Sequence, residues 1–210
     1  PSISIGPSIS IDKITMLAGR HNAIQQGKWL QARTARNLAP LMPYIGAGPI
    51  LDIGAAEGWN ARHIKQARPA CDVRLLDVVD LNRTEMPLTL YDGYHIPFAD
   101  NSFETALIML TLHHCRDPEA VLREAVRVTR RRLIVTESVY HTRPGRKLLW
   151  LLDTGFNSLR SGRLMPEALH FKKTGDWRTL FAGHNLAITA SFWLSRGLHN
   201  HIAFVLDQGE

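Results

Sequence analysis

Hydrophobic residues fall into seven short runs along the chain, separated by turn residues or by segments of helical composition. Most runs are continuous rather than alternating, which predicts strands of a parallel sheet that are buried on both faces. The last two runs lie close together in sequence, and this spacing predicts an antiparallel last strand. The predicted strands are Pro49–Ile53, Val73–Val79, Leu88–Tyr91, Thr105–Leu112, Leu133–Thr136, Ala187–Trp193 and Ile202–Leu206.

Helical segments lie between and before these runs. We expect one or two helices within Lys13–Ala39 and another within Glu57–Ala67. Asp117 can cap a further helix that begins at Pro118. The alternation predicts an α/β fold with a doubly wound, Rossmann-like sheet of seven strands, mostly parallel with an antiparallel last strand. N-terminal helices and a helical insertion after the fifth strand complete the expected fold.

The length of 210 residues and the hydrophobic content of 45% suit one domain with appendages. We expect residues 1–45 to form an N-terminal arm and helices that pack on the core. Residues 46–210 should form the main domain, with a lid-like insertion at residues 140–174. The opening residues lack the basic segment and the long apolar stretch of a secretion signal. No uncharged apolar run approaches the ~20 residues that a membrane-spanning helix needs.

Charge and cysteine content add little to this picture. The net charge of +6 would suit an anionic partner, but lysines and arginines are scattered, so nucleic acid is permitted and not indicated. Cys71 and Cys115 have no paired spacing of the kind found in disulfide frameworks or zinc sites. We therefore expect a reducing, cytoplasmic setting.

A glycine-containing turn follows the first predicted strand. Gly54 permits a tight turn from strand to helix, and Gly58 lets that helix pack closely on the sheet. Backbone N–H groups at the start of the helix suit a carboxylate, whereas Asp52, Gly54 and the loop suit the ammonium of an amino-acid moiety.

Acidic residues also end the next two strands. Asp77 ends the second strand, from which an acid can bind a ribose diol, with Asp80 as the alternative. Asp92 and Gly93 end the third strand and offer a carboxylate and close access to an adenine ring. Three acids at successive strand ends indicate one ligand, although each acid could also merely cap its loop.

The segments Tyr91–Glu104, Leu112–Pro118 and Leu122–Val128 resemble class I S-adenosylmethionine-dependent methyltransferases of the small-molecule, methyltransferase domain 11-like type. The resemblance runs from about Ile50 to Glu137. It implies S-adenosylmethionine as the cofactor and a small-molecule methyl acceptor as the partner. The residues implied to bind the cofactor are Asp52, Gly54, Ala55 and Gly58 for the methionine part, Asp77 for the ribose, Asp92 and Gly93 for the adenine, and Thr111 and Leu112 alongside.

Two positions depart from the family pattern. Ala56 stands where a glycine is usual, which we interpret as a small change. Thr129–Arg132 replaces a Lys-Pro-Gly-Gly turn, and we interpret it as a solvated basic turn remote from the ligand.

Methyl transfer from a sulfonium needs mainly alignment in line and exclusion of water, so catalytic residues can be few. His113 or His114, at the predicted end of the fourth strand, is best placed to accept a proton from the acceptor. Neighbours on a strand point to opposite faces, so we expect no shared metal and only one imidazole in the pocket. Residues expected to contact substrate after the fifth strand are Glu137, Tyr140 and His141.

Two further features bear on the acceptor. His199 and His201 share one face of the last strand, which we expect to be remote from the methyl group, so their expected role is structural. The insertion combines the apolar run Leu148–Leu152 with Arg143 and Lys147. This combination suits a lipid-like acceptor and peripheral contact with a membrane, although simple packing on the core explains it equally.

Other functional classes fit less well. The turn lacks the Gly-x-Gly-x-x-Gly pattern of dinucleotide-dependent oxidoreductases. The chain also lacks the Asn-Pro-Pro-Tyr and Pro-Cys motifs of DNA methyltransferases. An RNA or other nucleic-acid methyltransferase, and a non-catalytic methyltransferase-like scaffold, stay open as alternatives. The identity of the acceptor and the oligomeric state are not fixed by the sequence.

Overall fold

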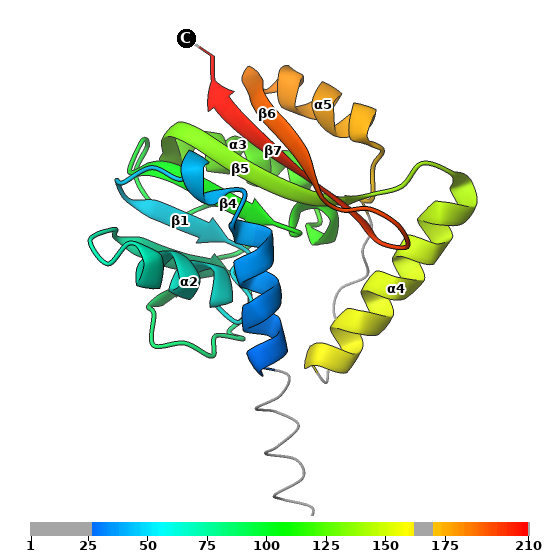
Figure 1. Ribbon diagram of the computed structural model, residues 1–210. Coiled ribbons are helices and arrows are strands. Elements are labelled where there is room, and N and C mark those ends of the chain that lie inside the picture. Colours follow the sequence, from blue (N-terminus) through cyan, green and yellow to red (C-terminus); the bar gives the residue numbers. More distant parts are fainter. Residues whose placement is uncertain (1–26, 162–169, 210) are drawn as a thin grey trace, which may run out of the picture.

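A seven-stranded sheet forms the centre of the computed structural model, which describes residues 27–161 and 170–209 (Figure 1). The strand order is β3-β2-β1-β4-β5-β7-β6. Strands β1 to β5 pair in parallel, whereas β7 is antiparallel to both β5 and β6. The predicted fold class is therefore confirmed. The strands are β1 (Ile50–Ile53), β2 (Val73–Asp77), β3 (Leu88–Leu90), β4 (Phe103–Met109), β5 (Thr129–Val139), β6 (Leu186–Ser195) and β7 (Asn200–Gln208).

Helices cover both faces of this sheet (Figure 1). On one face lie α3 (Pro118–Val128) and α5 (Thr174–Gly183), which contribute to the larger core cluster. The other face packs against α2 (Trp59–Ala67) and a helix at residues 27–38, which contribute to a second cluster. As the sequence predicts, the Asp117 side chain caps α3 by accepting a hydrogen bond from the backbone N–H of Ala120 at 2.9 Å.

The helix at residues 27–38 is the described part of the predicted N-terminal helices; the part expected before residue 27 lies outside the described residues. Leu30, Leu38 and Leu41 are buried, and the chain then passes through a short 3-10 helix, η1 (Met42–Tyr44), into β1. This helix therefore packs on the core, close to the carboxyl ends of the strands.

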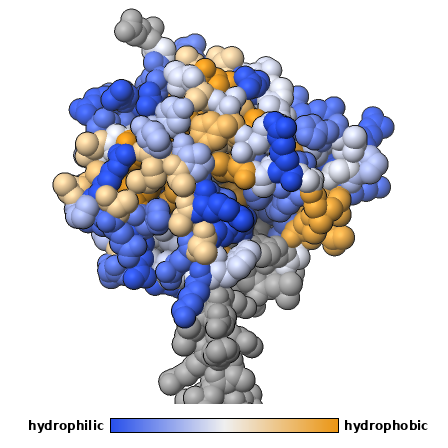
Figure 2. Space-filling view, viewed as in Figure 1, coloured by the Kyte–Doolittle hydropathy of each residue, from blue (hydrophilic) through white to orange (hydrophobic). Residues whose placement is uncertain are grey.

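The insertion after β5 is helical, as predicted. It forms α4 (Arg143–Ser161), in which Leu149 is buried against Phe171 and Tyr140. Leu148, Trp150 and Leu151 remain 38 to 61% exposed on α4. Figure 2 shows apolar side chains gathered over this part of the surface, at the right of the view. Among the described helices, none is long and apolar enough to cross a membrane.

Two expectations about the strands need correction. The fourth strand ends at Met109 rather than Leu112, because Leu110 takes a left-handed backbone conformation with φ of 57°. The 3-10 helix η2 (Leu112–His114) follows. Thr129–Arg132 is not a solvated turn but the first part of β5, paired with β4 and β7. Arg132 forms a two-point salt bridge with Asp207 of β7, at 2.6 and 2.7 Å.

Arg127 of α3 holds together the loop that follows β3. Its guanidinium donates to the carbonyl oxygens of Ile96 and Phe98, both at 2.9 Å, and to the Asp100 carboxylate at 2.6 Å. It also makes a two-point contact with Glu124, at 2.7 and 2.8 Å, and Glu124 accepts the N–H of Ile96 at 2.9 Å. The Glu-x-x-Arg pair of this helix is therefore a clamp on the loop.

Arg127→Lys should lower the free energy of unfolding by about 1–3 kcal/mol, because an ammonium cannot reproduce the planar set of hydrogen bonds. Urea denaturation followed by circular dichroism measures this loss. Arg123→Lys, at an exposed position of the same helix, is the matched control and should change stability by less than about 0.5 kcal/mol. Equal stability of the two variants would contradict the clamp.

Candidate cofactor and acceptor site

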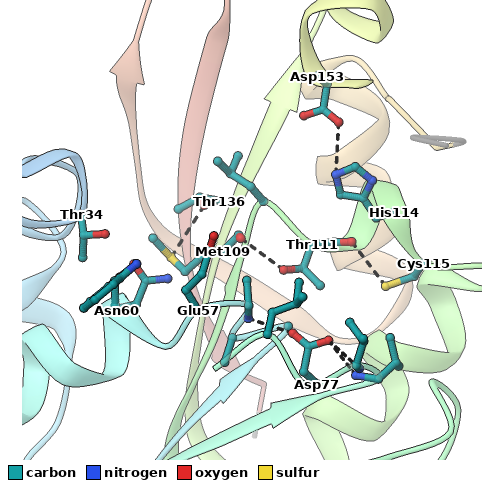
Figure 3. A pocket seen from close by; sticks show the side chains of 18 of the residues that line it. Thr34, Glu57, Asn60, Asp77, Met109, Thr111, His114, Cys115, Thr136 and Asp153 are labelled. Atoms are coloured by element: carbon teal, nitrogen blue, oxygen red, sulfur yellow. Dashed lines mark hydrogen bonds and ion pairs between the residues drawn. The ribbon is translucent and has the colours of Figure 1, made fainter. Parts of the chain in front are cut away.

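A cavity of about 660 Å³ lies at the carboxyl ends of the parallel strands, within the size range of small-molecule sites. Open α/β sheets place their ligands at this edge. Its wall combines the loop after β1, the ends of β2, β3 and β4, the helix at residues 27–38, Asp153 of α4, and residues of and beside β6 and β7. Figure 3 shows polar side chains from these elements pointing into one space.

Gly54 and Gly58 shape the turn after β1. Both adopt left-handed backbone conformations, with φ of 71° and 80°. A Cβ atom at Gly54 would lie 2.3 Å from the Thr111 side chain, so only glycine fits there. The turn exposes Gly54 and Ala55 to the cavity, whereas Gly58 lies behind it as the N-cap of α2.

Asp52 lies beneath this turn and does not line the cavity. Its side chain is fully buried, and neither carboxylate oxygen forms a hydrogen bond of normal geometry, although the backbone N–H of Ala61 faces the carboxyl. Burial, together with the negative charge of Asp77, raises the pKa of Asp52 to about 7. A buried carboxylate without a compensating partner suits a cation bound just above it, such as an ammonium group.

Asp77 lines the cavity at the end of β2. One carboxylate oxygen accepts the N–H of Ala56 at 2.8 Å, and the other accepts those of Val78 at 2.7 Å and Val79 at 3.2 Å. Burial raises the pKa of Asp77, and these hydrogen bonds oppose the shift. The Asp77 carboxylate therefore holds the loop after β1 and the loop after β2 together, and it also lines the cavity.

Asp92 and Gly93 line the cavity next to Asp77, after β3. The Asp92 carboxylate accepts the N–H groups of Tyr94 and His95, both at 2.7 Å, and these bonds lower its pKa to about 2. Gly93 has φ of 86°, in the left-handed region. Asp77 and Asp92 thus both cap loops and both line the cavity, and their contact with a cofactor stays a prediction.

The structure separates the predicted cofactor residues into two groups. Asp52, Gly58 and Leu112 are behind the cavity wall; Leu112 is fully buried and donates its backbone N–H to Glu137 at 2.9 Å. The predicted residues that line the cavity are Gly54, Ala55, Asp77, Asp92, Gly93 and Thr111.

His113 and His114 lie on the 3-10 helix η2, and both rings turn toward Asp153 of α4. His114 lines the cavity, and its Nε2 is 3.2 Å from an Asp153 oxygen (Figure 3). His113 is fully buried, with Nδ1 2.5 Å from Glu137 and Nε2 3.7 Å from Asp153. The prediction that the two imidazoles point to opposite faces is wrong, because β4 ends before them. The nitrogens and the Asp153 oxygen lie within 4.8 Å of one another, close enough to hold a metal ion.

This cluster is strongly coupled by charge. Burial alone would lower the pKa of His113, but the carboxylates of Glu137 and Asp153 outweigh burial and raise it to about 9. Burial would raise the pKa of Asp153, but hydrogen bonds from His113 and His114 hold it well below its usual range. His113 and Asp153 therefore each favour the charged form of the other.

The residues predicted to contact substrate after β5 do not line the cavity. Glu137 is fully buried beneath η2, and Tyr140 packs against Leu149 and Phe171. The His141 ring lies beside Trp193, with 5.9 Å between centroids. The long β5 carries all three past the edge at which β1 and β4 end.

His199 and His201 line the cavity, so a purely structural role is no longer the simplest interpretation of these two residues. Their rings lie 4.3 Å apart between centroids, and Ser138 of β5 is 3.3 Å from His199 Nε2. Burial, followed by the positive fields of His199 and Arg33, lowers the pKa of His201 to about 3, so its imidazole is neutral. Because β7 is antiparallel, it begins at the carboxyl ends of the parallel strands, so both residues lie beside the cavity.

Asp153 is a cavity residue that the sequence did not single out. It follows the apolar run of α4 and lies four residues after the buried Leu149, on the same face of the helix. An acidic residue on the apolar face of the predicted helix was the feature of the sequence that could have indicated it.

The fold and the arrangement of this cavity define the class: the chain carries a class I S-adenosylmethionine-dependent methyltransferase domain. Within that class, residues 51–134 match the family described as "Methyltransferase domain".

The similarity to curated relatives extends over only part of this chain and part of each relative. The chain is 35% identical over 89 residues to a demethylmenaquinone methyltransferase of Streptomyces griseus, spanning 40% of this chain and 39% of that protein. It is 26% identical over 160 residues to the uncharacterized protein YafE of Escherichia coli, spanning 73% of this chain and 62% of that protein. The chain thus spans less than two thirds of each relative.

Solved structures share the fold at low identity. A methyltransferase from Thermotoga maritima, dependent on S-adenosylmethionine, has a TM-score of 0.65 at 15% identity, covering 89% of this chain and 96% of its own. The cyclase SpnF has a TM-score of 0.63 at 14% identity, covering 88% and 82%. These likenesses concern the fold alone.

Ala56 takes a left-handed conformation with φ of 48°, at the position where a glycine is usual. Ala56→Gly should raise the free energy of unfolding by about 0.5–1 kcal/mol. Left-handed backbone costs an L residue about 1–2 kcal/mol, and the greater unfolded-state entropy of glycine removes roughly 0.4–1 kcal/mol of that gain. The interpretation of Ala56 as a small change is therefore too weak.

Chemical denaturation measures the effect. The control is Ala32→Gly, at an exposed position of the helix at residues 27–38, which should destabilise by up to about 1 kcal/mol. If both variants lost stability alike, Ala56 would not be strained.

Proposed function

We propose that this protein binds S-adenosylmethionine in the cavity and transfers its methyl group to a small-molecule acceptor. The observation that supports the proposal most is the convergence of the Gly54 turn, Asp77 and the Asp92–Gly93 pair on one cavity within the segment that matches the family. Each of these features is found at a different strand end, and together they suit three parts of one nucleoside ligand.

The residues of the cavity suit each part of this cofactor. The buried carboxylate of Asp52 offsets the positive amino-acid end above the turn, where Gly54 leaves room for a close approach. Asp77 retains acceptor capacity for a ribose diol, and Gly93 lets an adenine ring lie close to the backbone. When bound, S-adenosylmethionine supplies an electrophilic methyl group on a sulfonium.

The acceptor would occupy the other end of the cavity. That end combines apolar side chains, Leu30, Met109 and Leu194, with the polar groups of Arg33 and His199. Such a wall suits a largely apolar molecule with a hydroxyl group. Several curated relatives are named demethylmenaquinone methyltransferase, and a reduced naphthoquinone is an acceptor of this chemistry. We therefore propose a hydroxylated aromatic acceptor.

His114 and Asp153 are placed to orient the reacting group of the acceptor. Both line the cavity, and their contact of 3.2 Å joins η2 to α4. His113 lies behind them and does not reach the ligand space, so its role is to hold the other two in position. Helix α4 then acts as a wall of the acceptor end, consistent with the proposed lid-like insertion.

Isothermal titration with S-adenosylmethionine, and separately with NAD, tests the cofactor. We expect binding of S-adenosylmethionine and none of NAD. Asp77→Ala and Asp92→Ala should each weaken binding about 10- to 100-fold, because each removes hydrogen bonds to the ligand from a charged group. Asp72→Ala, an exposed acid that does not line the cavity, should leave affinity unchanged.

Circular dichroism confirms that each variant is folded before titration. Wild-type affinity in both folded cavity variants would mean that the cofactor binds elsewhere. Binding without methyl transfer to reduced demethylmenaquinone, or to a panel of hydroxylated aromatic compounds, would favour the non-catalytic scaffold.

A further inference from the structure

We propose that His113, His114 and Asp153 bind one divalent transition-metal ion, such as Zn²⁺, at the acceptor end of the cavity. The ligands are two imidazoles and one carboxylate, a donor set typical of Zn²⁺ and of neighbouring first-row metals. They come from two separate elements, η2 and α4.

The distances between the ligand atoms support a shared ion. Oδ2 of Asp153 lies 3.2 Å from His114 Nε2, and Oδ1 of the same carboxylate lies 3.7 Å from His113 Nε2. Two atoms bound to tetrahedral zinc at 2.0–2.1 Å are about 3.4 Å apart, which falls between these two values. All three ligand positions lie within 4.8 Å of one another, so a small inward rotation of the rings would complete the site.

The environment of His113 is the second observation. Its Nε2 is fully buried, 3.7 Å from Asp153, and has no hydrogen-bond partner within 3.5 Å among the described residues, whereas its Nδ1 contacts Glu137 at 2.5 Å. Metal-binding histidines usually donate the other ring N–H to a carboxylate, which fixes the tautomer and increases the basicity of the ligand. Glu137 fills this supporting position and also accepts the N–H of Leu112, which anchors η2.

The charges of the cluster suit a cation. The carboxyl group of Glu137 contacts the imidazole of His113, and that of Asp153 contacts both imidazoles. Because a ligating imidazole is neutral, a divalent ion would bring the positive charge that this group of side chains lacks. The ion would then be held by two neutral imidazoles and Asp153, with Glu137 as the outer carboxylate.

The site would open onto the cavity on one side. His114 and Asp153 line the cavity and His113 closes the back, so three protein ligands leave a coordination position toward the acceptor. If the proposed methyl transfer is correct, this position suits an acceptor hydroxyl, whose ionisation a metal favours. The metal site itself does not depend on that activity.

Metal binding can be measured on the full chain without cofactor or acceptor. Protein freed of its purification tag and dialysed against a chelator is titrated with Zn²⁺ by calorimetry and with Co²⁺ by visible absorption. We expect one ion per chain with micromolar affinity or tighter, and Co²⁺ bands typical of four-coordinate nitrogen and oxygen ligands.

Variants identify the ligands. His113→Gln, His114→Gln and Asp153→Asn should each weaken Zn²⁺ binding at least 100-fold. Glu137→Gln should weaken it about 10- to 100-fold and leave the Co²⁺ spectrum four-coordinate, as expected for an outer partner. His63→Gln, on α2 and outside the cluster, should bind as the wild type does.

No saturable binding, or binding that is unchanged in folded His114→Gln and Asp153→Asn, would overturn the proposal. His114→Gln keeps the test decisive if the fully buried His113 cannot be replaced without unfolding. Since S-adenosylmethionine binding is measured on the same metal-free protein, failure of the metal site leaves the proposed function standing, and the reverse also holds.

Discussion

The close approach of the β1 turn to the end of β4 is the constraint on which the site depends. A side chain at Gly54 would collide with Thr111, so the chain can leave β1 at this angle only with glycine there. The turn then passes over Asp52 and donates the backbone N–H of Ala56 to Asp77 on the neighbouring strand. One steric condition thus fixes the floor of the cavity and joins the ends of β1, β2 and β4.

The cavity has two ends of different electrostatic character. Carboxylates gather at the ends of β1 to β3, where Asp52 is buried and lacks a hydrogen-bond partner. Histidines gather at the other end, around Asp153, and burial keeps His201 neutral. A ligand with a cationic centre and a polar acceptor beside it would match both ends at once. The charge of Asp77 adds to burial in raising the pKa of Asp52, so a cation beside these two groups would relieve repulsion as well as gain attraction.

The sequence predicted the sheet well because buried parallel strands leave a strong local signal. Continuous apolar runs located all seven strands, and acids at three successive strand ends located one side of the cavity. The edge beyond β4 could not be predicted in the same way. His113 and His114 continue an apolar run, but a left-handed Leu110 and the hydrogen bond from Leu112 to Glu137 end the strand before them. That bond joins residues 25 positions apart in sequence, and no local pattern reveals it.

Long-range packing brings Asp153, His199 and His201 to the cavity. Their positions in the sequence show how much of the cavity the family match accounts for. The family match ends at residue 134, and these three residues, together with Arg33, lie outside it. The end of the cavity proposed for the cofactor is therefore built mostly from the shared segment. The end proposed for the acceptor is built largely from α4, the β6–β7 hairpin and the helix at residues 27–38. A cyclase and methyltransferases have this fold at similar TM-scores, so the sheet alone does not choose the chemistry. The groups that distinguish this chain are the cavity residues on elements outside the family match, at the ends of the strands. In the His113–His114–Asp153 cluster, two histidines from the matched segment meet an aspartate from outside it.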